Sequence, residues 1–199
     1  MEDKAMQNFE FYAPTRMIFG KDTHKQVGKL VKEYGFKKVF VHFGGASAKK
    51  SGLLDTVLDA LKAENIDYVT LGGVQANPTL AMAREGIELG KKEGVDFILA
   101  VGGGSAIDTA KGIKFYSKLD FDILAVPTTA GTGAEVTRFS VLYRNKDKES
   151  VSDYSIIPNF QIFDYTTLKS LPYEQKVVTS LDAFCHSVED FWSVDATNE

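Results

Sequence analysis

The sequence predicts an α/β fold, a mostly parallel Rossmann-like sheet with helices on both faces. Short apolar runs, such as residues 96–101 and 123–126, have the composition of strands that are buried on both faces. Longer segments between these runs carry apolar residues at helical spacing. The resulting order, β-α-β-α-β-α-β, is typical of parallel sheets that bind ligands at the C-terminal ends of their strands.

The first strand and helix are predicted before residue 36. Residues 9–18 alternate apolar and polar side chains around Pro14, which predicts an edge strand. Residues 21–23 offer an N-cap to a helix over 24–34, and Gly35 ends that helix. The same criteria predict further strands at 39–43 and 68–71, and further helices at 53–61 and 80–93.

The most informative turn follows the strand at 96–101. Glycines 102–104 separate this strand from a helix predicted over 105–116, with Ser105 as its N-cap and Asp108 in its first turn. Glycine lets an anion approach the backbone, and the free N–H groups and the helix dipole stabilise the negative charge. We interpret the turn as a phosphate cradle. A glycine triplet alone is equally consistent with a tight βα turn.

Two other predicted strands end in similar residues. The turns at 44–47 and 127–133 are also rich in Gly, Ser and Thr. Because the C-terminal ends of parallel strands meet at one edge of a sheet, the three turns together favour nucleotide binding over coincidence. The remaining predicted elements are a β-hairpin over 138–157 with a charged tip at 144–149, and a strand at 161–164.

Composition limits the classes of function and partner. The 199 residues are 44% hydrophobic and carry a formal net charge of −4, so the sequence predicts a soluble globular protein. The sequence has no stripe of Lys and Arg that would favour nucleic acid as a partner, and no apolar run that is long enough to cross a membrane. The one cysteine, Cys185, permits no disulfide within the chain, which favours a cytoplasmic location.

The last predicted helix, residues 173–192, carries apolar side chains on more than half of its surface. Such a helix needs more protein to pack against, and the chain ends seven residues later at Glu199. We therefore expect a longer polypeptide or an isolated domain, with an α/β domain over 1–170 and the beginning of a helical domain over 171–199.

The last helix also carries a candidate metal site. Asp182 and His186 are four residues apart, so they share one face of the helix and form half of a metal site. The spacing alone is also that of an ordinary Asp–His pair on a helix. Of the other histidines, we expect His24, at the start of a helix, to face solvent and His42, within a strand, to lie in the core.

Six motifs together resemble the iron-containing alcohol dehydrogenases in order and spacing over nearly the whole chain. They are residues 11–20, 44–52, 72–78, 102–111, 127–137 and 181–189. The resemblance implies a dehydroquinate-synthase-like fold, in which an α/β nucleotide domain precedes an all-helical metal domain and the substrate binds between them. It implies hydride transfer between NAD(P)(H) and a small primary alcohol or aldehyde, with Fe²⁺ or Zn²⁺ polarising the substrate oxygen.

The resemblance also implies roles for individual residues. Glycines 103 and 104 with Ser105 would hold the diphosphate, Asp108 would orient that loop, and the threonines would line the nicotinamide side. The full set of expected cofactor-binding residues is Gly44, Gly45, Ala46, Ser47, Asn77, Gly103, Gly104, Ser105, Asp108, Thr128, Thr129 and Thr132. Asp182 and His186 would be two of four metal ligands. The family's other two are later histidines, and none follows His186, so this chain alone would not complete the site.

The turn at 44–47 bears on the choice of cofactor. NAD sites usually place an acid at the end of the second strand, but this turn has none, and Lys49 and Lys50 follow it. NADP(H) is therefore favoured over NAD(H). Relatives often place a lysine near the position of Ser150, beside the cofactor, and here Lys148 is the nearest candidate.

Two other functions fit the same sequence. One is a sister enzyme of this fold, such as a glycerol dehydrogenase or a dehydroquinate-synthase-like lyase. The other is a nucleotide-binding module without turnover, because half of the metal ligands are missing. For either, an edge strand at 9–18 offers unpaired backbone groups to a second copy, which predicts a homodimer.

Overall fold

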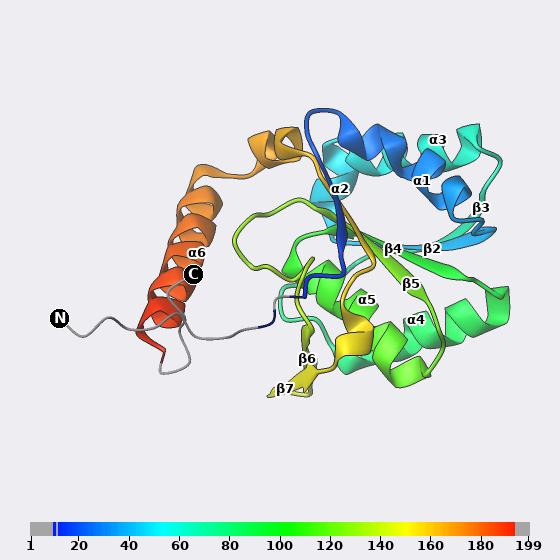
Figure 1. The fold of residues 1–199 in the computed structure, drawn as a ribbon. Coiled ribbons are helices and arrows are strands. Elements are labelled where there is room, and N and C mark those ends of the chain that lie inside the picture. Colours follow the sequence, from blue (N-terminus) through cyan, green and yellow to red (C-terminus); the bar gives the residue numbers. More distant parts are fainter. Residues whose placement is uncertain (1–9, 11, 194–199) are drawn as a thin grey trace.

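The computed structural model describes residues 10 and 12–193, in which a six-stranded parallel sheet lies between two layers of helices (Figure 1). The strand order is β1-β8-β5-β4-β2-β3. These strands are β1 (Arg16–Phe19), β2 (Lys38–Phe43), β3 (Asp67–Leu71), β4 (Phe97–Gly102), β5 (Asp122–Pro127) and β8 (Phe160–Phe163). The α/β fold class that the sequence predicts is confirmed.

Helices connect these strands, and a hairpin is inserted after β5. The helices are η1 (Thr23–Gln26), α1 (Val27–Glu33), α2 (Ala46–Lys50), α3 (Leu53–Ala63), α4 (Leu80–Glu93), α5 (Gly104–Ser117), η2 (Tyr154–Ile156), η3 (Tyr165–Ser170) and α6 (Tyr173–Trp192). The hairpin consists of the antiparallel strands β6 (Phe139–Arg144) and β7 (Asp147–Ser152), as predicted. Its turn is only residues 145–146, so the charged tip expected at 144–149 is too long, and the rest of it belongs to the two strands. None of the helices in the described part of the chain is long and apolar enough to cross a membrane.

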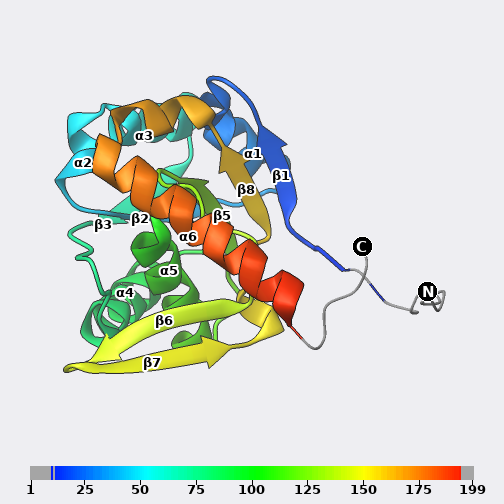
Figure 2. The ribbon, with the colours of Figure 1, turned by 90° about the vertical axis from the view of Figure 1, so that its left-hand side faces the viewer.

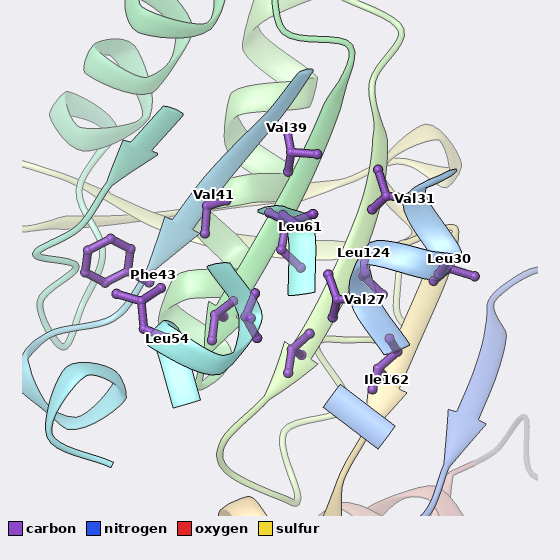
Figure 3. Close-up of a cluster of buried hydrophobic side chains, with 14 of the residues drawn as sticks. Val27, Leu30, Val31, Val39, Val41, Phe43, Leu54, Leu61, Leu124 and Ile162 are labelled. Atoms are coloured by element: carbon purple, nitrogen blue, oxygen red, sulfur yellow. The ribbon is translucent and has the colours of Figure 1, made fainter. Parts of the chain in front are cut away.

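The central strands read as continuous apolar runs because both of their faces are covered. In β4, Phe97, Leu99 and Val101 pack with α1 and α3, whereas Ile98 and Ala100 point to the opposite face and pack with α4 and α5. Figure 3 shows the first of these two clusters, in which side chains from α1 and α3 meet those of β2, β5 and β8. Every residue of β4 is buried, as a parallel strand with helices on both faces requires.

The first elements differ in detail from the prediction. The strand expected over 9–18 begins only at Arg16, because Pro14 cannot continue a ladder and the partner strand β8 is itself preceded by Pro158. The positions 9 and 11 lie outside the described residues. The helix expected from residue 24 starts as the 3₁₀ turn η1. Asp22, within the expected N-cap segment, has a left-handed backbone with φ of 61° and caps nothing with its side chain.

Helix α6 meets the rest of the chain mainly at the turn after β5, where a Cβ added to Gly131 would lie 2.3 Å from the carbonyl oxygen of Thr179. Figures 1 and 2 show it running across the end of the sheet where the strands finish, from beside α2 and α3 to the β6–β7 hairpin. None of its residues is buried. Its exposed apolar side chains are Tyr173, Val177, Val178, Leu181, Phe184, Phe191 and Trp192. The predicted helix is thus confirmed, and the domain boundary at 170 stays a prediction.

Candidate dinucleotide and metal site

The glycine turn between β4 and α5 forms the middle of the site. Gly103 is the N-cap of α5, and the helix begins at Gly104. The predicted N-cap, Ser105, is therefore wrong, since it is already the second helical residue. Gly103 can take the cap position because its backbone is extended, with φ of −77° and ψ of −173°. The first N–H groups of α5 point out of this end of the helix, where they attract an anion.

The turn after β4 touches the turn after β5. A Cβ added to Gly103 would lie 3.0 Å from Oγ1 of Thr129, and one added to Gly104 would lie 3.3 Å from Oγ1 of Thr132. The two turns are also joined by a hydrogen bond of 3.0 Å from the backbone N–H of Thr128 to the carbonyl of Gly102. A side chain at either position would press on the neighbouring threonine, so glycine favours the close approach of the two turns and leaves the backbone N–H groups open, as a phosphate cradle needs.

A first cavity, of about 640 Å³, opens on one side of this turn. We call it the turn cavity, because its walls come from the turns that follow β2, β4, β5 and β8. The predicted cofactor residues that line it are Gly44, Gly45, Gly103, Gly104, Ser105, Thr128, Thr129 and Thr132. Ala46 and Ser47 begin α2 at its edge, and their side chains fall outside the described part of the structure.

A second cavity, of about 780 Å³, opens on the other side. We call it the hairpin cavity, because β6 and β7 supply one wall and α6 another. Asn77 and Asp108 line it, together with His186 from α6 and Lys148 from β7. Both cavities are lined by Gly104, Ser105 and Thr132, so they meet at the start of α5.

Asp108 and Lys111 connect α5 to β6 of the hairpin and to the residues just before it. The carboxylate of Asp108 accepts a hydrogen bond of 3.1 Å from the backbone N–H of Val141. Nζ of the fully buried Lys111 donates to the carbonyls of Thr137, at 2.7 Å, and Phe139, at 2.8 Å. These contacts fix residues that line the hairpin cavity. That Asp108 orients the glycine loop stays a prediction.

Burial shifts the pKa values of Asp108 and Lys111 in opposite directions, and each shift favours the neutral form of the side chain. It raises the pKa of Asp108 to about 6, against the opposing effects of the Val141 N–H and the Lys111 ammonium. It lowers the pKa of Lys111 to about 8, although the nearby carboxylates of Asp108 and Glu135 oppose the shift. Asp108 is therefore a carboxyl group near the hairpin cavity that can exchange a proton close to neutral pH.

Asp182 and His186 lie together on α6, as their spacing predicts. Nε2 of His186 is 3.8 Å from Oδ1 of Asp182, and Nδ1 is 3.8 Å from a carboxylate oxygen of Glu189. Two ligands of a tetrahedral metal at ordinary bond lengths lie about 3.4 Å apart, so Asp182 and His186 fit half of such a site. Among the described residues, no group of three or more His, Cys, Asp or Glu side chains is arranged to hold a metal ion.

Sequence reasoning missed several residues of the turn cavity. His24 was expected to face solvent, and this is wrong: it is 9% exposed, lines the cavity and is bonded to Asp164. Thr166 and Thr167, which follow β8, line the same cavity. A signal for them existed, since residues 164–167 place polar side chains after a predicted strand just as residues 128–132 do. His42 is fully buried on β2, and its prediction is confirmed.

Known proteins resemble the chain in sequence and in structure. The family model described as iron-containing alcohol dehydrogenase matches residues 14–165. A probable NADH-dependent butanol dehydrogenase 2 of Bacillus subtilis is 37% identical over 205 residues, which are 94% of this chain and 52% of that protein. An NADPH-dependent butanol dehydrogenase of Clostridium saccharobutylicum is 32% identical over 202 residues, which are 91% of this chain and 51% of that protein.

The structural comparison agrees. The crystal structure of NADH-dependent butanol dehydrogenase A from Thermotoga maritima has a TM-score of 0.92 and 33% sequence identity, and covers 97% of this chain and 53% of that chain. The chain thus spans about half the length of the curated relatives it matches.

Proposed function

The chain belongs to the iron-containing alcohol dehydrogenase family, and from this premise we propose that it binds a nicotinamide dinucleotide that exchanges hydride with a small primary alcohol or aldehyde. The observation that carries the proposal is the meeting of two cavities at Gly104 and Ser105. A dinucleotide has two nucleoside halves joined by a diphosphate, and this arrangement offers a space for each half with an anion cradle between them.

The chain's own residues then have distinct tasks. The backbone N–H groups at the start of α5 bind the diphosphate, and the absence of side chains at Gly103 and Gly104 lets it approach. Thr129 and Thr132 border the cradle on the side of β5. Asp108 lies in the hairpin cavity, where it holds or releases a proton near the bound nicotinamide and substrate.

We assign the metal half-site to Asp182 and His186. His186 lines the hairpin cavity that also contains Asp108, so a divalent ion held there would lie on the substrate side of the dinucleotide. When bound, the dinucleotide and the ion supply hydride transfer and polarisation of the substrate oxygen, respectively. A complete site needs further ligands besides these two.

A preference for NADP(H) follows from the chemistry of the turn after β2. Gly44 and Gly45 line the turn cavity and have no carboxylate to repel a 2′-phosphate. Nζ of Lys49 lies over the ring of Phe43, 5.2 Å from its centroid, which supports a positive charge at this edge of the cavity. Relatives named as NADH-dependent and as NADPH-dependent both match the chain, so the preference rests on the turn.

Calorimetric titration of the chain with NADPH and with NADH tests the proposal. We expect saturable binding, tighter for NADPH, and a loss of at least about tenfold in the Gly103→Val variant, whose side chain would occupy the cradle. Ala46→Asp should weaken NADPH binding and leave NADH binding unchanged. A folded wild-type chain that binds neither dinucleotide would contradict the proposed function, and equal NADPH affinity in Ala46→Asp would contradict the role of the turn.

Two further properties stay predictions. The free edge of β1 is suited to pairing with a second copy, and Met17 and Phe19 on this strand are 56% and 64% exposed, which supports a homodimer. The predicted cytoplasmic location rests on cysteine usage alone.

A further inference from the structure

A buried His–Asp pair lies in the wall of the turn cavity, and the proposed function does not use it. His24 follows β1 and Asp164 follows β8, and Nδ1 of His24 is 2.6 Å from Oδ2 of Asp164. The two residues are 9% and 1% exposed. Burying a titratable pair costs desolvation free energy unless hydrogen bonds compensate its polar groups.

Both carboxylate oxygens of Asp164 accept hydrogen bonds. Oδ1 accepts from the backbone N–H of Thr166 at 2.8 Å and from the Thr166 hydroxyl at 2.6 Å. Burial alone would raise the pKa of Asp164, but the hydrogen bonds from Thr166 and His24 outweigh it and lower the pKa. Because an ionised carboxylate only accepts, Nδ1 of His24 carries a hydrogen and donates it.

The tautomer of His24 determines what the ring offers to a ligand. With the hydrogen on Nδ1, the neutral ring has an acceptor at Nε2, and Asp164 fixes the orientation of that ring. His24 lines the turn cavity, so the atom left for a ligand there is this acceptor. Because Asp164 fixes the ring, Nε2 of His24 can only accept a hydrogen bond, so it favours a ligand group that donates one.

The position of His24 indicates which part of the dinucleotide it meets. The hairpin cavity contains Asp108 and His186, so it takes the nicotinamide half, and the turn cavity takes the adenosine half. Thr128 and Thr129 line only the turn cavity, so this assignment leaves Thr132, which lines both cavities, as the one expected threonine on the nicotinamide side. Along the sheet, β1 is three strands away from β4, whose end holds the diphosphate cradle. His24 therefore lies toward the part of the adenosine farthest from the phosphates, which is the base.

We infer that Nε2 of His24 accepts a hydrogen bond from the exocyclic amino group of the bound adenine, and that Asp164 positions the ring for this contact. The inference rests on the proposed function. It makes His24 a specificity residue for the adenine base and leaves hydride transfer to the other cavity. A base with an oxo group in place of the amino group would place its acceptor oxygen against the acceptor Nε2 of His24, which lowers the affinity for the dinucleotide.

The test compares NADPH with its hypoxanthine analogue, in which an oxo group replaces the adenine amino group. We expect the wild-type chain to bind NADPH more tightly by about two- to tenfold, the range of one hydrogen bond. The variant His24→Asn keeps an N–H donor near the position of Nδ1 and removes Nε2. It should retain the wild-type melting temperature and bind both dinucleotides with equal affinity.

The matched variant His24→Gln does the opposite, because its amide reaches the position of Nε2 but leaves Asp164 without its partner. We expect this variant to lose thermal stability and to keep more of the base preference than His24→Asn. Equal binding of the two dinucleotides by the wild type, or an undiminished preference in His24→Asn, would overturn the inference and leave His24 as a cross-link between η1 and η3. Binding of neither dinucleotide by the wild type would instead overturn the proposed function.

Discussion

The α/β body and helix α6 contribute to one proposed site but differ in how their side chains are held. In the body, the polar residues His42, Lys111 and Asp164 are at most 2% exposed. On α6 no residue is buried, and the side chains of Asp182 and His186 are 48% and 62% exposed. The proposed dinucleotide cradle therefore lies on a packed body, whereas the side chains of the proposed metal half-site are not buried by the described residues. Equivalent substitutions should have large effects in the body and small ones on α6.

The largest expected effect is the dependence of the free energy of unfolding on acid pH, which arises from His42 in the body. Its ring stacks on Phe40 and, among the described residues, neither ring nitrogen has a partner within full hydrogen-bond geometry; the backbone of Leu71 on β3 opposes the effect of burial only in part. Burial lowers the pKa of His42 from 6.5 to about 4. The unfolded chain therefore binds the proton more readily, and the free energy of unfolding should fall as the pH falls from about 6.5 to 4. The loss corresponds to about 3 kcal/mol in total.

Urea unfolding across this pH range, with matched histidine variants, measures the effect. His42→Leu should remove about 3 kcal/mol of the acid sensitivity, while His186→Leu on α6 should retain the wild-type dependence. An unchanged pH dependence in His42→Leu would mean that the buried ring is not the source. If His42→Leu and His186→Leu both lost the pH dependence, the distinction between the body and α6 would be contradicted.

A pair of lysines sharpens the comparison at neutral pH. Lys111 in the body and Lys176 on α6 both donate from Nζ to backbone carbonyls, the former at 2.7 and 2.8 Å and the latter at 3.3 Å. Lys111→Met should cost about 2 kcal/mol of unfolding free energy, because the carbonyls of Thr137 and Phe139 lose their donor while the desolvated ammonium is removed. Lys176→Met should change it by less than about 0.5 kcal/mol. Similar losses in both variants would contradict the comparison.

Within the body, the sequence predicted the central strands best. Strands β2, β4 and β5 were predictable because a strand covered on both faces is an uninterrupted apolar run, a local property of the sequence. The glycine turn was predictable because it too is a local property of the sequence. Only its N-cap was wrong, since the cap is Gly103 and not Ser105. The order of the strands in the sheet was not predicted, because it depends on crossovers between elements.

The residues that sequence reasoning missed are those whose environment comes from distant parts of the chain. His24 is buried by a bond to Asp164, which lies 140 residues later, so its position at a helix start was misleading. Lys111 has carbonyl partners in the segment leading into β6, and no local pattern predicts that a lysine enters a core. Conversely, the pair on α6 was predictable because residues four apart share one face of any helix.

The smallest effect is expected from the metal half-site itself. Asp182→Ala and His186→Ala remove exposed side chains 3.8 Å apart, and each should change the free energy of unfolding by less than about 0.5 kcal/mol. His186 lines the hairpin cavity, but neither side chain lines the turn cavity or forms the cradle, so NADPH affinity should stay within about twofold of wild type by calorimetry, with or without added Zn²⁺. A loss of NADPH affinity in either variant would instead show that the metal half-site contributes to holding the dinucleotide. The division between a packed cradle and an unsupported metal half-site would then be incorrect.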